Sequence, residues 1–222
     1  VYVGPVAAYS TLGWFADPLT GAMLRRDETH LARVMFHELA HQALYVPDDT
    51  DFNEAFATAV ADVGVSLWLR QTGIGEEAVP SFTQRREAAF VQLLLDARAD
   101  LAAIYARAAP ATVRLAAKAR RIEALQQEYE RWKQRWGADP GTDRWMQHSL
   151  NNAKLASVAT YHGLVPGLLC LGRREGGDVA AVITAGERLA ALQPGKRRRC
   201  LEALTDCPDT PLPSTCAQRP PA

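Results

Sequence analysis

Hydrophobic positions in the first part of the chain recur at the spacing of two consecutive helices. Between residue 27 and about residue 44, apolar side chains return every three or four positions, which predicts an amphipathic helix. Pro47 ends that pattern, and it resumes between residue 51 and about residue 70. Asp51 is expected to cap this second helix, because Glu54 follows it at the spacing of a capping box. A helix pair with a tight reversal is therefore predicted.

A second helical pair is predicted further along the chain, over residues 82–107 and 111–136, joined at Ala109-Pro110. Because the connection is short, we expect an antiparallel hairpin. Its second helix carries a near-heptad apolar stripe, which we interpret as core contact. The members of the stripe are Leu115, Ala119, Ile122, Leu125, Tyr129, Trp132 and Trp136. The basic run 114–121 is interpreted as a solvated face.

The rest of the chain predicts shorter elements. Helical patterns cover about 143–172 with a break near Pro166, and also 178–191 and 196–205. Residues 1–24 are rich in glycine, aromatic and β-branched residues, which favours short strands or extended segments. We expect a mainly helical, zincin-like α+β domain over residues 1–205 with a small N-terminal β element. Residues 206–222 form a proline-rich tail.

Composition excludes some function classes. The 222 residues carry 25 lysines and arginines against 25 aspartates and glutamates, so the net charge is zero. A general nucleic-acid binder would need a basic excess, so no nucleic-acid partner is expected. No apolar run is seen to approach the roughly 20 residues that cross a bilayer. The chain begins at Val1 without a signal pattern, so we expect it to be processed or part of a longer protein.

All four cysteines lie in the last quarter of the chain, at positions 170, 200, 207 and 216. None forms the close pair that is typical of a zinc site built from thiolates. Two disulfides with three alternative connectivities are one interpretation, and four reduced thiols are the other. The tail offers little else to hold it, which favours at least one bridge.

One motif carries chemistry. Residues 37–41 read His-Glu-Leu-Ala-His within a helical pattern. Residues four apart share a helix face, so His37 and His41 can bind one cation. Glu38 lies beside that face, where it can act as a general base on a water molecule at the metal. Zn²⁺ binds neutral imidazole well, which predicts a catalytic zinc site. The alternative is two helix histidines with ordinary hydrogen bonds.

A third protein ligand is required at such a site. Leu44 and Pro47 stand where a metzincin would have glycine and histidine, which excludes that subclass. Glu54 is the leading candidate, because it lies in the first turn of the second helix after the reversal. Asp48, Asp49 and Asp51 are its rivals, and one of them is an alternative candidate for orienting a ligand histidine.

These residues resemble the gluzincin metallopeptidases, because His37–Gln42 followed by Phe52–Ala57 is similar to the pattern of M1 aminopeptidases. A closer resemblance is to a family of bacterial proteins described as predicted or putative aminopeptidases. It extends over about residues 1–170. It is carried by Tyr9–Phe15, Asp17–Leu19, His37–Ala57, Asn151–Leu155, Ala159–Tyr161 and Val165-Pro166. The resemblance implies a zinc peptidase that acts on a peptide or protein. It also implies an export or lipoprotein signal before Val1 and hence a periplasmic or envelope location.

The resemblance also suggests further site residues. Tyr161 is the first candidate to stabilise the oxyanion, ahead of His162. Independently of the resemblance, Tyr45 lies four residues past His41 and is expected to border the site. Tyr9 begins a segment that, by analogy with zincins, would bind an extended peptide along its edge. M1 enzymes bind the substrate amine with a glutamate where this chain has Leu24, so Glu28 is the candidate replacement.

Two other functions stay open from the sequence. One is a zinc endopeptidase of the cell envelope, and the other is a non-catalytic helical envelope scaffold. Glu38 separates an enzyme from a scaffold, because a structural zinc site has no use for a general base.

Overall fold

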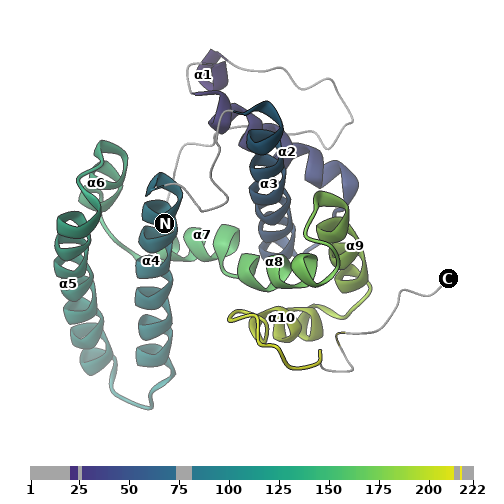
Figure 1. The fold of residues 1–222 in the computed structure, drawn as a ribbon. Coiled ribbons are helices and arrows are strands. Elements are labelled where there is room, and N and C mark those ends of the chain that lie inside the picture. The colour runs from purple at the N-terminus through teal and green to yellow at the C-terminus, as the bar shows by residue number, and fades with distance from the viewer. Residues whose placement is uncertain (1–20, 25–26, 74–81, 213–215, 217–222) are drawn as a thin grey trace. The chain divides into compact units, whose positions relative to one another are not determined.

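A computed structural model describes residues 21–24, 27–73, 82–212 and 216. Every regular element within these residues is a helix, and none is a strand (Figure 1). The helical prediction is therefore confirmed, whereas the α+β character has no support in the described residues. The expected N-terminal β element, with Tyr9, lies outside them.

Contacts along the described residues separate two compact units. One unit covers residues 82–159, and the other joins residues 21–73 to the residues from 160 onwards. The hairpin region forms a compact unit of its own, and the single domain expected over residues 1–205 stays a prediction. The residues of the candidate metal site belong to the other unit.

The predicted hairpin consists of α4 (Phe82–Ala106) and α5 (Ala111–Trp136), which run antiparallel side by side (Figure 1). Most of the predicted apolar stripe packs in its core, where Leu125 is 0% exposed and Trp132 is 7% exposed. The start of the stripe does not, because Leu115 near the tip of the hairpin is 60% exposed. Core contact was therefore predicted correctly for the later turns and wrongly for the first.

The helix expected over about 143–172 is three helices: α6 (Pro140–Gln147), α7 (Asn152–His162) and α8 (Val165–Arg174). Buried Lys154 explains the first break, since its ammonium donates to the carbonyls of Trp145 and His148 at the end of α6. Asn151 accepts from the amide of Lys154 and starts α7. The second break was predicted near Pro166, which lies in the first turn of α8, where its missing N–H costs nothing.

The run Asn152–Arg174 has a mean hydropathy of 1.4 over its most apolar window. Length and composition alone would allow it to cross a membrane, but a buried core helix passes the same test. Within that window 44% of the residues are buried inside the protein. Some of its apolar side chains pack in the protein core, where Leu155 is 1% and Leu168 is 0% exposed.

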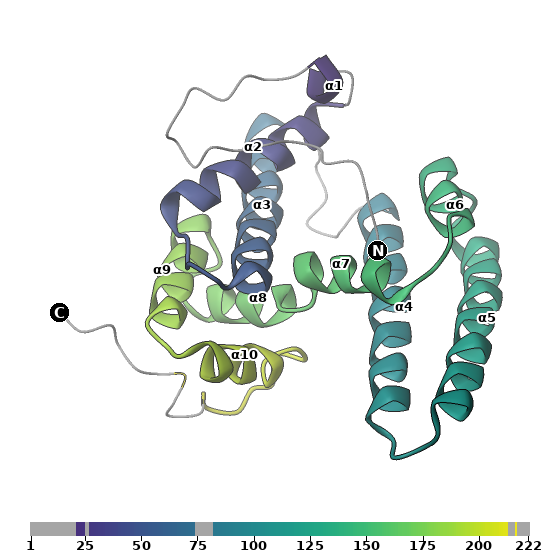
Figure 2. The ribbon, with the colours of Figure 1, turned by 180° about the vertical axis from the view of Figure 1, so that it is seen from behind.

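The second unit is built around α3 (Thr50–Thr72), which packs against α2 (Glu28–Ala43), α8 and α9 (Val179–Ala190). The short α1 (Gly21–Leu24) contacts α2, and α10 (Pro194–Glu202) lies against α8 (Figure 2). Phe52 and Phe56 are fully buried in the core. Because the side chains of the first turns of α3 are buried in this core, the core holds that part of the helix in place.

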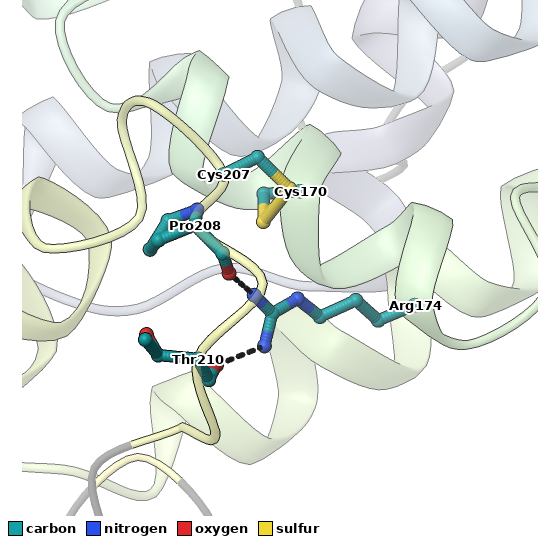
Figure 3. The surroundings of a disulfide bond; sticks show 5 residues. All are labelled: Cys170, Arg174, Cys207, Pro208 and Thr210. Carbon is teal, nitrogen blue, oxygen red and sulfur yellow. Dashed lines mark hydrogen bonds between the residues drawn. A yellow bond between two sulfur atoms is a disulfide. The ribbon is translucent and has the colours of Figure 1, made fainter.

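Two disulfides close the C-terminal region, which resolves the alternatives that the sequence left open. Cys170 in α8 pairs with Cys207, and Cys200 in α10 pairs with Cys216. Beside the first bridge, the guanidinium of Arg174 donates to the carbonyls of Pro208 and Thr210 (Figure 3). The chain after α10 is thus fixed to α8 by a covalent bond and by hydrogen bonds.

Candidate metal centre

The two histidines of the motif lie on one face of α2, as their spacing predicts. The ring centroids of His37 and His41 are 4.9 Å apart and the rings meet edge to face. His41 is buried, with 8% of its side chain exposed, and His37 is half-buried at 18%. This face of α2 lies toward α3, so the opposing helix decides what completes the site.

Asn53 fixes the reversal between α2 and α3. It is 2% exposed, its Oδ1 accepts from the amide of Val46 at 2.9 Å, and its Nδ2 donates to the carbonyl of Val46 at 2.7 Å. One side chain thereby satisfies both backbone groups of a loop residue. Because Glu54 directly follows Asn53, this pair of bonds also fixes the position of the Glu54 backbone.

The N-cap of α3 is Asp49, whose carboxylate accepts from the amide of Phe52 at 3.3 Å. The sequence prediction of Asp51 as the cap was therefore wrong by two residues. Asp49 also pairs with Arg197, which is 2% exposed and donates to the carbonyls of Leu189, Ala190 and Leu192. This arginine ties the start of α3 to the end of α9.

A close approach of the two helices brings their facing side chains within bonding range. A Cβ built on Gly64 of α3 would stand 2.7 Å from the ring of Phe36 in α2. A side chain at position 64 would push α2 away, and Phe36 directly precedes His37. Arg33 and Asp62 add an ion pair between the same helices.

Glu54 lies against both imidazoles. Its Oε2 is 3.2 Å from Nε2 of His37 and 3.9 Å from Nε2 of His41, and the candidate ligand atoms of all three residues lie within 4.8 Å of one another. Ligands placed about 2.1 Å from zinc at tetrahedral angles would be about 3.4 Å apart. Two imidazoles and a carboxylate are donors that zinc accepts, and the separations of 3.2 and 3.9 Å from Glu54 bracket the expected spacing, whereas the full spread of 4.8 Å would have to contract around an ion.

Burial favours the metal-binding form of His41. Desolvation lowers the pKa of His41, the neighbouring His37 lowers it further, and the carboxylate of Glu54 opposes them. A neutral imidazole is the form that ligates a metal. Nδ1 of His41 is buried and has no hydrogen-bond partner among the described residues.

Tyr161, at the end of α7, reaches the same place from a distant part of the sequence. Its ring stacks on that of His37 with centroids 6.2 Å apart, and 41% of its surface is exposed. Burial raises the pKa of its phenol, and the charges of Glu54 and Glu38, with a hydrogen bond to Glu54, raise it further. The phenol is therefore a protonated donor near both glutamates.

The structure places the other candidates differently. Tyr45 borders the site, with its ring centroid 6.4 Å from that of His41. Glu28 lies exposed in the first turn of α2, nine residues before His37. That separation corresponds to about 13 Å along the helix and half a turn around it. Glu28 is therefore not brought to the histidines.

The rival aspartates are occupied elsewhere. Asp48 is exposed in the turn, and Asp49 is the helix cap. Asp51 accepts from Thr160 at 2.8 Å and pairs with Arg198 at 3.0 Å. Sequence reasoning missed the roles of Asn53, Gly64 and Thr160. The position of Asn53 directly before Glu54, inside the resembling segment, was the available signal.

Comparison with known proteins found one family. A family model described as "Putative aminopeptidase" matches residues 1–201. The comparisons with curated proteins and with solved structures found no match.

Proposed function

The chain belongs to the putative aminopeptidase family, and from this premise we propose that it is a zinc-dependent peptidase of gluzincin type. His37, His41 and Glu54 would hold the metal. The observation that carries the proposal is the convergence of two imidazole nitrogens on one carboxylate oxygen, at 3.2 and 3.9 Å. The M1-like order of the motifs, with the glutamate ligand on the next helix, agrees with it.

When bound, zinc would polarise the peptide carbonyl and lower the pKa of a water molecule. Glu38 is half-buried on α2, next to the ligand His37, and close enough to Tyr161 to affect its pKa. We assign to Glu38 the removal of a proton from the attacking water and its delivery to the leaving amine. We assign to the phenol of Tyr161 a hydrogen bond to the carbonyl oxygen as negative charge develops there.

The family name favours removal of N-terminal residues, and we propose aminopeptidase action first. The alternative is an endopeptidase of the cell envelope, and one observation favours it. Glu28, the candidate for binding a free substrate amine, lies on the far side of α2 from the histidines. Two disulfides are typical of an oxidising compartment, which supports our proposal of a periplasmic or envelope location.

The test combines metal analysis with the Glu38→Gln variant. Purified protein should contain one zinc ion per chain and should cleave members of a peptide library, with products identified by mass spectrometry. Glu38→Gln should keep its zinc and lose about 10²–10⁴-fold in kcat, because the charge that accepts the proton is removed.

Glu123→Gln is the matched control, because Glu123 is an exposed residue of α5 in the hairpin unit. It should behave as the wild type. Loss of single N-terminal residues from library peptides would support the aminopeptidase, and internal cuts would support the endopeptidase. Wild-type protein that binds zinc and cleaves no peptide would overturn the proposed function in favour of a scaffold.

A further inference from the structure

Helices α3 and α7 meet through two successive side-chain contacts. Asp51 and Glu54 are one helical turn apart on α3 and therefore lie on the same side of it. Asp51 accepts from the hydroxyl of Thr160 at 2.8 Å, while Glu54 interacts with the phenol of Tyr161, the next residue of α7. The contact between Tyr161 and Glu54 bears on the candidate chemistry. The neighbouring contact between Thr160 and Asp51 does not involve a proposed metal ligand.

The carboxylate of Asp51 is held from its other side. Its Oδ2 accepts from Arg198 of α10 at 3.0 Å, which leaves Oδ1 toward Thr160. The guanidinium of Arg198 also donates to Glu202 at 3.0 Å, within α10. Asp51 of α3 therefore joins the last turn of α7, through Thr160, to α10, through Arg198.

We infer that Thr160 and Asp51 are positioning residues that set the place of the Tyr161 hydroxyl relative to Glu54 and the two histidines. The inference rests on the proposed function and deepens it. Tyr161 is 41% exposed at the end of a helix, so little packing restricts it. The hydrogen bond from Thr160 to Asp51 holds the backbone next to Tyr161 against the first turn of α3. Neither positioning residue is one of the three proposed metal ligands, since the structure engages Asp51 with Thr160 and Arg198 instead.

Transition-state stabilisation depends steeply on this kind of placement, since a shift of about 1 Å can cost about 100-fold in rate. Loss of the Thr160 hydroxyl would let the last turn of α7 move from α3 while α2 and α3 keep their own contacts. The metal ligands would stay in place, and only the donor to the developing oxyanion would be displaced. The effect is therefore expected in kcat rather than in KM or zinc content.

The experiment compares Thr160→Val, which removes the hydroxyl at nearly constant shape, with Thr160→Ser, which keeps it. Activity is measured on zinc-loaded full-length protein, with a quenched fluorogenic peptide chosen from the library sequences that the wild type cleaves. Thr160→Val should lower kcat by about tenfold or more with KM within about twofold, and Thr160→Ser should restore most of it. Thr72→Val is the matched control, because the Thr72 hydroxyl bonds only carbonyls of α3 among the described residues, at the end of the helix.

A double-mutant cycle with Tyr161→Phe tests the route of the effect. If Thr160 acts through the phenol, Thr160→Val should change kcat by less than about twofold in the Tyr161→Phe background. Equal losses in both backgrounds, an unchanged kcat in Thr160→Val, or a parallel loss of zinc would overturn the inference while the peptidase stands. Absence of cleavage by the zinc-loaded wild type would instead remove the proposed function and this inference with it.

Discussion

Substitution of Asn53 should disturb the backbone that positions the site without removing a proposed metal ligand or catalytic residue. Asn53 binds no metal in the proposed centre, yet its amide makes both hydrogen bonds to Val46 that hold the reversal before α3. Asn53→Ala removes both bonds at once. The backbone N–H of Val46, which is half-buried, loses the acceptor that Asn53 provides, whereas its carbonyl keeps the amide of Asp49 as a donor at 3.4 Å.

The magnitude follows from those contacts. Two neutral hydrogen bonds contribute about 1 kcal/mol each, and leaving the N–H of Val46 unsatisfied adds about 1 kcal/mol more. We expect a loss of about 2–3 kcal/mol in the free energy of unfolding of the unit that contains α3. At roughly 3 °C per kcal/mol for a unit of this size, its Tm should fall by about 6–9 °C.

Zinc affinity should fall with stability, because Glu54 directly follows Asn53 and metal binding is coupled to local folding. Differential scanning calorimetry and chelator competition measure the two effects. Asn152→Ala is the matched control, since Asn152 is exposed and bonds Tyr105 in the hairpin unit. An Asn53→Ala protein within about 0.5 kcal/mol of the wild type, with unchanged zinc affinity, would refute the reasoning.

Two further predictions concern parts of the chain outside the site. Asp139 caps α6, and hydrogen bonds from backbone amides, above all that of Thr142, hold its pKa below the usual value, so Asp139→Ala should lose about 1 kcal/mol at neutral pH. Because the folded-state pKa is depressed, this stabilisation is present above the unfolded-state pKa of about 3.9 and disappears as pH falls through the folded value; unfolding curves of both proteins should converge in acid, and a constant difference would contradict the assignment. The bond between Cys200 and Cys216 closes a segment with a sequence separation of 16, so the double serine variant should be less stable by about 3 kcal/mol in denaturant titration, and equal midpoints would argue against the bridge.

The local sequence pattern was enough to predict an element wherever its own residues determine its structure. The spacing of His37 and His41 places both imidazoles on one helix face in any helical context. The hairpin was predicted nearly to the residue, because its two long periodic segments flank Pro110. Glu54 could be proposed as the third ligand because a short reversal places the first turn of the next helix close to the end of α2.

Prediction failed where a distant partner overrides a local rule. Asp51 and Glu54 match a capping box, yet Asp49 is the cap, where it also pairs with Arg197 from α10. The break after α6 depends on Lys154, a lysine whose pKa is lowered by burial and which no local pattern marks as buried. Both outcomes depend on charges that pack against an element from outside it.

The amino-acid sequence by itself determined the helix pair α2 and α3, the hairpin, the pair of imidazoles on α2 and the glutamate that follows on α3. These features depend on interactions within a few residues, which helical periodicity records directly. Only the tertiary structure decided that Tyr161 stacks on His37, that Thr160 bonds Asp51, and which cysteines pair. Such contacts join residues far apart along the chain. They form where α8 packs against α3, α10 packs against α8, and side chains of α7 and α10 bond the first turn of α3, a result that no local spacing encodes.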